Sequence, residues 1–202
     1  MKFPFFASFI VFIVWLSYEI AKHNRIDADV NREFWRKEHR AGKVSKKPLD
    51  NLDYITIPYE RLPMQALKDD EQVAEYIETV NSLSDSPIVN FTGITNTDLK
   101  LQYGTLNIDR LSRYDQNYTI LARTLDRWAS YLYKKGCISE ARDILEFAVS
   151  TKTDVSGTYK LLCQIYKEEN TPEKIKPLYH VAESVNSIMK NTIVRILQES
   201  EQ

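Results

Sequence analysis

The chain opens on a block of hydrophobic residues that has no polar face. Residues 3–18 carry no charge and are dominated by Phe, Ile and Val. Apolar character all round a helix is typical of a membrane span, which needs roughly 17–25 apolar residues. We therefore predict a transmembrane helix over residues 3–21, with the flanking Lys2 and Lys22 reaching out towards the headgroups.

A cleaved signal peptide is the main alternative for this block, and a buried core helix is a weaker one. Signal cleavage needs two small residues separated by one position. Ser17 would need a small residue at Trp15, and Ala21 would need one at Glu19, so neither site fits. The sequence favours an uncleaved anchor.

A second pattern follows the anchor. Residues 27–42 are predicted to be helical, and Val30, Phe34 and Trp35 form a small apolar patch among basic side chains. Such a helix either lies on anionic headgroups or continues the anchor helix into solvent. We favour the continuation, because one aromatic pair is a thin apolar face.

Residues 44–64 break the helical pattern. Pro48, Pro58 and Pro63 exclude a long helix here. Residues 54–57 are strand-like in type, but the chain offers them no evident strand partner. We predict that residues 22–64 form a basic juxtamembrane helix and then an extended, proline-containing linker that lies over the helices of the body.

From residue 65 to residue 202, the apolar positions recur at helical spacing. One face is formed by Val73, Ile77, Val80 and Leu83, after a capping box of Asp69 and Gln72. A turn-rich link over residues 87–98 follows, either as a simple connection or as a binding loop. The pattern then predicts helix from Thr97 to Tyr114, with a weak point at Gly104.

Residues 118–189 contain an internal repeat. A helix over residues 118–135 ends at Gly136, and a second helix follows. A shift of 34 residues brings similar residue types onto one another at eight positions. The pairs are Leu125 with Tyr159, Trp128 with Leu162, Ala129 with Cys163, Leu132 with Tyr166, Gly136 with Asn170, Ala141 with Ile175, Leu145 with Tyr179 and Ala148 with Ala182.

This period and pattern resemble the tetratricopeptide repeat family over residues 122–187. The resemblance implies two helical hairpins, at about residues 122–155 and 156–189, in an all-α solenoid. The second unit departs from the family, because Ile175 replaces a small residue and Pro177 should interrupt or delay its second helix. Since two units bury too little alone, we expect residues 70–114 and a closing helix around residues 185–196 to complete the stack.

The resemblance also implies a partner-binding groove along the first helix of each unit. By register, its lining residues are Arg123, Asp126, Ser130, Tyr133, Lys134, Lys160, Gln164 and Lys167. Family members that clamp a carboxylate carry Lys and Asn where this chain has Asp126 and Ser130, so that clamp is not expected here. The groove instead suits an extended or helical peptide, or it is an ordinary wetted face.

Composition and motifs narrow the function. A net charge of −1 gives no reason to expect a nucleic-acid partner. The two cysteines, Cys137 and Cys163, have no zinc or disulfide spacing, and no phosphate loop or hydrolase motif is present. We expect no cofactor, no metal, no small-molecule substrate and no enzyme activity. An enzyme without a recognisable motif stays as a weak alternative, for which Cys137 and His180 are the residues to test.

The flanking charges predict orientation. Lys2 alone precedes the anchor, whereas nine Lys or Arg residues follow it between Lys22 and Lys47. Basic residues stay on the cytoplasmic side. We therefore expect a single-pass membrane adaptor that contacts the bilayer through residues 3–21 and binds a protein or peptide partner in the cytoplasm. The alternative is an anchored chaperone or assembly factor on the outer side of the membrane.

Overall fold

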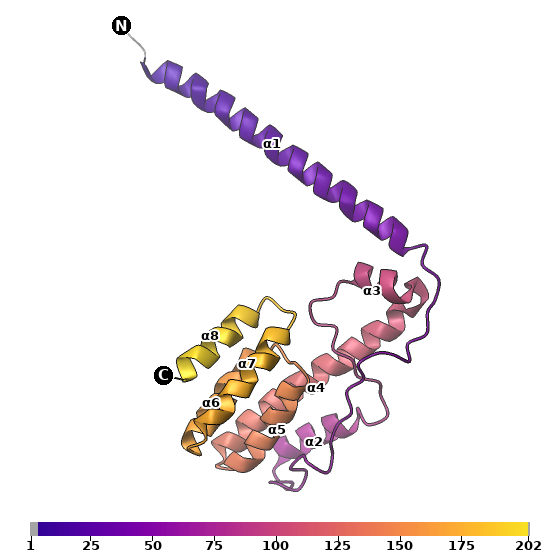
Figure 1. Cartoon of the computed structure of the whole chain (residues 1–202), viewed down its shortest axis with the longest axis vertical. Helices are drawn as coiled ribbons and strands as arrows, with labels where there is room; N and C mark the ends of the chain where they lie inside the picture. Colours follow the sequence, from indigo (N-terminus) through magenta and orange to yellow (C-terminus); the bar gives the residue numbers. More distant parts are fainter. Residues whose placement is uncertain (1–3, 202) are drawn as a thin grey trace.

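One long helix projects from a bundle of shorter helices (Figure 1). The structure is a computed structural model that describes the backbone of residues 4–201 and the side chains of residues 8–23 and 27–201. Over those residues the chain is all-helical, as the sequence predicts, with no β-strand. Its α-helices are α1 (Pro4–Ala41), α2 (Glu71–Asn81), α3 (Asn96–Tyr103), α4 (Ile108–Lys134), α5 (Ile138–Ser150), α6 (Ser156–Glu168), α7 (Ile175–Ser184) and α8 (Lys190–Ser200).

The projecting helix α1 is continuous over 38 residues. At 1.5 Å per residue it is about 57 Å long. The predicted basic helix is therefore a continuation of the amino-terminal helix, and we call residues 22–41 the stalk. Among the described residues, we find no helix that combines the length and the apolar character needed to cross a membrane. Residue 3 of the predicted span, and the side chains of residues 3–7, lie outside the described part of the chain.

The end of the stalk is fastened to α3. Lys37 forms an ion pair with Asp98, with 2.6 Å between Nζ and Oδ1. The Glu38 carboxylate accepts a hydrogen bond from Thr97 Oγ1 at 2.7 Å and pairs with Lys100. We call these five residues the clasp. Because the clasp joins two rigid helices through several directed bonds, it sets the direction in which α1 leaves the body.

Acid should loosen the clasp. Bonding to Lys100 and Thr97 lowers the pKa of Glu38 below its ordinary 4.5, and bonding to Lys37 and Thr95 lowers the pKa of Asp98 below 3.8. A carboxylate with a lowered folded-state pKa contributes stability above its ordinary pKa and loses it as the pH falls through the lowered value. Spin labels at Asn31 and Glu78 should therefore give a narrow distance distribution at neutral pH that broadens below about pH 4.

The control for this experiment is a chain with Lys37→Ala and Lys100→Ala, which should give a broad distribution already at neutral pH. A wild-type distribution that stays narrow in acid while the body remains folded would show that other contacts hold α1 in place.

The linker after the stalk packs onto the body. Leu49 and Leu52 are buried in a small core cluster beside α3, and Ile57 and Leu62 are buried in the main core. This confirms that the segment lies over helices. The prediction that its strand-like part has no partner is wrong: Tyr54 forms an isolated antiparallel bridge with Val89. That partner comes from the irregular 87–95 link, which carries no strand pattern of its own.

Two local predictions around α2 and α4 need correction. The side chain that caps α2 is Asp70, whose Oδ1 accepts from the backbone N–H of Gln72 and of Val73, and not Asp69. The helix predicted from Thr97 to Tyr114 is divided at Gly104, and residues 108–134 form one helix. Nothing between Tyr114 and Tyr118 stops a helix, whereas Gly104 adopts a φ of +89° that helices do not contain.

The core of the body follows the 34-residue repeat. At seven of the eight matched pairs the side chains lie in the core, and all of them are buried except the partly buried Tyr179. The eighth pair, Gly136 and Asn170, ends α4 and α6, and both residues have positive φ. The sequence therefore identified correctly which face of each helix points inward and where each first helix ends.

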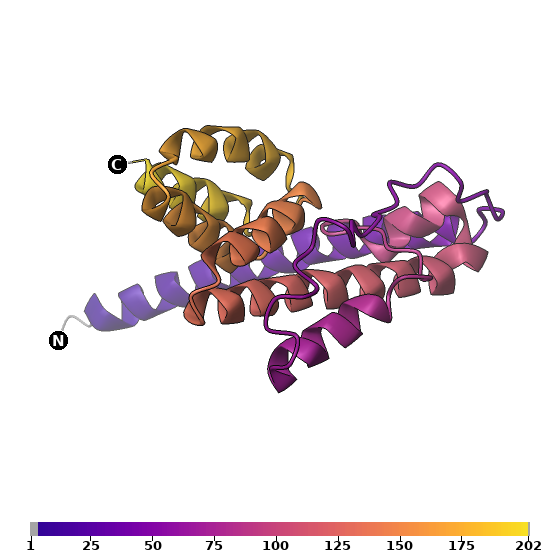
Figure 2. The same ribbon diagram turned by 90° about the horizontal axis from the view of Figure 1, so that it is seen from below.

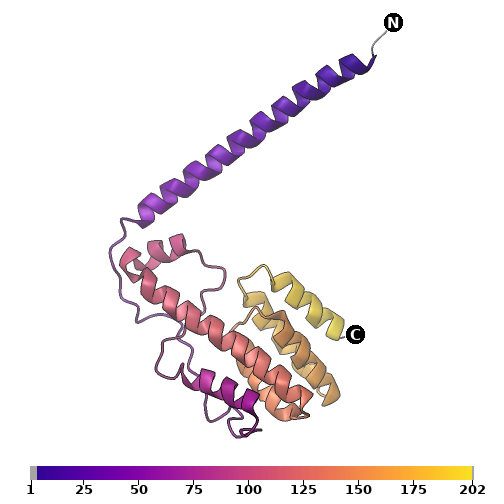
Figure 3. The ribbon, with the colours of Figure 1, turned by 180° about the vertical axis from the view of Figure 1, so that it is seen from behind.

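The second hairpin packs differently from the first, because α4 and α5 lie against each other whereas α6 and α7 scarcely touch. A short 3-10 turn at Pro172–Lys174 delays the start of α7, which places Pro177 in its first turn, where a missing N–H costs nothing. α8 packs against both α6 and α7, and Figure 3 shows it as the outermost helix of the stack. It begins at Lys190, five residues later than the predicted closing helix, because residues 185–189 form an irregular link.

α2 covers the opposite side of α4. Seen from below, α4 runs between α2 and the stack of α5 to α8 (Figure 2). Tyr59 donates a hydrogen bond from its hydroxyl to the carbonyl of Val80 at 3.2 Å, which holds the linker against the end of α2. The missing layer expected beside the two hairpins is thus supplied by α2 and the linker.

Candidate functional site

The predicted groove residues lie on α4 and α6, which are neighbours in the body. Tyr133 on α4 donates a hydrogen bond from its hydroxyl to Glu168 Oε1 on α6 at 2.5 Å. Gln164 Nε2 donates to the Tyr133 hydroxyl oxygen at 2.7 Å and to Glu168 Oε1 at 3.0 Å. The structure therefore brings Tyr133 and Gln164 together and adds Glu168, which the register argument left out.

A second bond crosses the same seam. Thr158 Oγ1 on α6 donates to Asp126 Oδ1 on α4 at 2.9 Å. Gly157 permits this approach, because a Cβ there would lie 3.3 Å from the same oxygen. Asp126 is half-buried and already bonded, so its role in this structure is to join the two helices. Thr158 carries no sequence signal except its place one position before the matched Tyr159.

The hydrogen bonds between Tyr133, Gln164 and Glu168 change the pKa values of the two ionisable groups. Hydrogen bonds from Tyr133 and Gln164 lower the pKa of Glu168, and the same carboxylate raises the pKa of Tyr133. The Glu168 carboxylate is therefore held in its charged form by two neutral donors, the Tyr133 hydroxyl and the Gln164 amide.

Most of the remaining predicted residues are exposed on the same face. Ser130 is half-buried, whereas four cationic side chains are exposed and form no ion pair within the described residues. They are Arg123, Lys134, Lys160 and Lys167. We call these four residues, with Tyr133 and Gln164, the α4/α6 face. It offers several free cations beside a hydrogen-bonded tyrosine, which is suited to carboxylates or backbone carbonyls of a partner.

Sequence reasoning missed a hollow on another side of the body. A depression of about 340 Å³ lies between the linker and α5, lined in part by Arg61, Glu146 and Phe147. It exists because the irregular linker crosses α5 at this point. No local pattern in the sequence reports such a crossing between segments more than eighty residues apart.

The candidate catalytic residues have ordinary surroundings. Cys163 is 1% exposed, and burial raises the pKa of its thiol, which is the opposite of an activated nucleophile. Cys137 is half-buried at the turn between α4 and α5, and His180 is exposed on α7. Over the described residues, no three His, Cys, Asp or Glu side chains are grouped so that they could hold a metal ion.

Comparisons of the chain with protein-family models, with curated proteins and with solved structures give no significant match.

Proposed function

We propose that this chain is a membrane-anchored adaptor whose helical body, built on tetratricopeptide-like hairpins, binds a protein partner on the cytoplasmic side. The observation that carries the proposal is the uncovered apolar surface of α1. Between Phe9 and Ile20, large apolar side chains are exposed on every side of the helix, and no part of the described body covers them. Exposed apolar surface of this extent marks a contact with membrane or protein.

The anchor supports the adaptor role by raising local concentration. Two membrane-bound molecules meet far more often than two free ones, so a weak binding surface is sufficient. The stalk adds a spacer between anchor and body, and the clasp keeps that spacer in one direction. The α4/α6 face would then be presented at a set distance from the membrane.

Topology is tested by protease protection of a carboxy-terminal epitope tag. A tag that survives in cells stripped of outer layers, and is lost only after lysis, supports a cytoplasmic body. A tag lost from intact cells places the body outside and favours the anchored envelope chaperone. A tag that remains in the soluble fraction after lysis would contradict the anchor itself.

Partner capture tests the α4/α6 face. A photo-crosslinker placed at Ser130 should capture a partner, and Lys160→Glu with Lys167→Glu should reduce that capture by about tenfold. The control carries Lys68→Glu and Lys176→Glu, two exposed lysines elsewhere on the body that make the same change in net charge. Equal capture by both double variants would show that the partner binds another surface.

A further inference from the structure

The outer side of the stalk carries an aromatic and cationic surface that has no role in the fold. Trp35 is 63% exposed, and a shallow hollow on the helix is lined by Trp35, Arg36, His39 and Arg40 together with Arg32 and Glu33. We call Trp35, Arg36, His39 and Arg40 the stalk face. These residues form two adjacent rows along the helix. Trp35 and His39 make one row and Arg36 and Arg40 the other, with the members of each row one helical turn apart.

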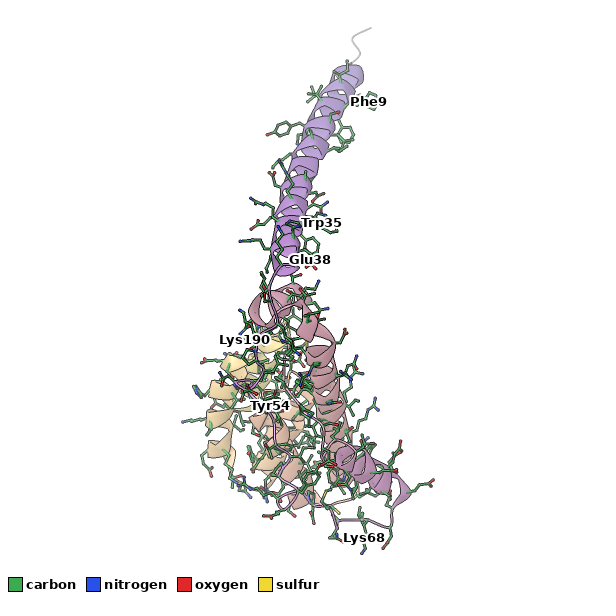
Figure 4. The ribbon with its side chains drawn as sticks, turned by 90° about the vertical axis from the view of Figure 1, so that its right-hand side faces the viewer. Phe9, Trp35, Glu38, Tyr54, Lys68 and Lys190 are labelled. Carbon is green, nitrogen blue, oxygen red and sulfur yellow. The ribbon has the colours of Figure 1, made fainter. Side chains whose placement is uncertain are left out.

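The stalk face lies beside the clasp but shares no residue with it. Lys37 and Glu38 bond to side chains of α3, and Figure 4 shows Trp35 on the stalk just above Glu38. The neighbouring Arg32 is neutralised within the stalk, because it forms an ion pair with Asp29 at 2.5 Å. Arg36 and Arg40 have no such partner among the described residues, so their charge is available to another molecule.

The positive charge extends past the end of α1. Lys43, Lys46 and Lys47 are exposed, and none of them forms an ion pair within the described chain. Guanidinium groups bind carboxylates through paired hydrogen bonds, and an exposed indole contributes apolar area at a small entropic cost. An arrangement of two arginines one turn apart, with a parallel row of Trp and His, matches a helix that carries carboxylates one turn apart.

We propose that the stalk face docks an acidic helical segment of a partner protein. This inference concerns a second surface, distinct from the α4/α6 face. It rests on the proposed membrane anchor in one respect only, the argument that excludes lipid as the occupant. Charge complementarity supplies attraction and orientation, and Trp35 supplies the apolar contact. The partner would therefore be held at two places, by the body and by the stalk.

Anionic lipid is excluded as the occupant by the continuity of α1. With residues 3–21 in the bilayer, Arg36 stands about 22 Å along a straight helix from the end of the span. Surface charge is screened within about 8 Å at physiological ionic strength. Headgroups of the membrane that holds the anchor therefore lie beyond the reach of the stalk face.

The acidic patch on α2 of the same chain is also excluded. Glu71, Glu75 and Glu78 form an exposed acidic patch on α2. Figure 1 places α2 at the end of the body furthest from α1, and the clasp fixes the direction of the stalk. The acidic patch of one chain cannot fold back onto its own stalk face.

The test uses the full chain in neutral detergent micelles and a fluorescein-labelled helical peptide of Glu, Ala and Leu, with carboxylates one turn apart. Arg36→Glu with Arg40→Glu should weaken peptide binding by about tenfold or more, and Trp35→Ala should weaken it severalfold. Arg36→Lys with Arg40→Lys should retain the salt-dependent part of the affinity. The matched control, Lys68→Glu with Lys176→Glu, makes the same change in net charge at two exposed lysines of the body and should have no effect. Figure 4 shows Lys68 at the end of the body opposite the stalk.

Three results would overturn the proposal. Peptide binding that is unchanged by the Arg→Glu pair removes the stalk face as a docking site. If the Arg→Glu pair loses binding to phosphatidylserine-containing vesicles but still binds the peptide, the stalk face is a lipid-binding surface. Loss of self-association in the Arg→Glu pair assigns it to a second copy of the chain. Flotation with neutral phosphatidylcholine vesicles tests the anchor separately, since no stalk variant should alter it.

Discussion

Replacing Gly104 with alanine will destabilise the body by about 3 kcal/mol or more, because two independent penalties meet at this residue. Gly104 has φ of +89° and ψ of 148°, a backbone conformation that is essentially restricted to glycine. A Cβ would also lie 2.3 Å from the carbonyl oxygen of Ser45 and 2.9 Å from the Cα of Lys46. Both contacts are with backbone, which cannot rotate away as a side chain can.

The penalty falls on the joint between stalk and body. Next to Gly104, the Lys47 amide donates to the Tyr103 carbonyl at 3.0 Å, and Asn107 Nδ2 donates to the Lys47 carbonyl at 2.8 Å. Thr105 Oγ1 donates to the Ala41 carbonyl at 3.0 Å. A methyl group at residue 104 would push Ser45 outward and so strain all three of these hydrogen bonds. Gly104→Ala should therefore also expose residues 42–48 to limited proteolysis before the body unfolds.

Alanine substitutions at two other glycines measure the backbone penalty and the steric penalty separately. Gly136 has φ of +85°, but a Cβ there meets no atom within 4 Å, so Gly136→Ala should cost only about 1 kcal/mol. Gly42 has no positive φ, and a Cβ would make ordinary contacts of 3.6 and 3.7 Å, so Gly42→Ala should be nearly neutral. Urea unfolding of the three variants measures all three values. Equal costs for Gly104→Ala and Gly136→Ala would show that the linker yields without resistance.

The features that could be predicted from the sequence are those that depend on local pattern. Inward-facing positions of α4 to α7 follow from helical spacing, and the shift of 34 residues matches Trp128 with Leu162 and Gly136 with Asn170 from residue types alone. Proline explains the late start of α7 in the same way. Each of these inferences needs only residues within one or two turns of a helix.

The clasp and the α4/α6 seam could not be predicted in this way. Glu38 meets Thr97 and Lys100 across about sixty residues, and Asp126 meets Thr158 across 32. Polar residues such as these look like solvated helix faces in the sequence, since their partners are set by how helices pack. The register argument therefore placed Asp126 and Tyr133 on one face of α4, but it could not show that both side chains are bonded to α6.

Replacing Trp128 with alanine will remove a large part of the stability of the body. Trp128 is 0% exposed and lies in the main core, where it is the largest of the fully buried side chains. Large-to-small changes of this kind cost about 3–5 kcal/mol, because the lost transfer energy is joined by the cost of the cavity. Since domains of this size are stable by about 5–15 kcal/mol, Trp128→Ala should shift the urea midpoint strongly or prevent folding.

Two further variants keep this prediction testable if Trp128→Ala fails to fold. The indole Nε1 of Trp128 is buried and has no hydrogen-bond partner in the described structure. Trp128→Phe removes that unsatisfied donor and keeps most of the apolar volume, so it should cost less than half as much as the alanine variant. Trp35→Ala makes the same chemical change at an exposed stalk residue and should leave the urea midpoint unchanged. If Trp128→Phe lowers the free energy of unfolding only slightly and Trp35→Ala leaves it unchanged, the loss in Trp128→Ala comes from core packing. If Trp128→Phe lowers it by as much as is expected for Trp128→Ala, Nε1 donates to a group or water that the described contacts do not contain.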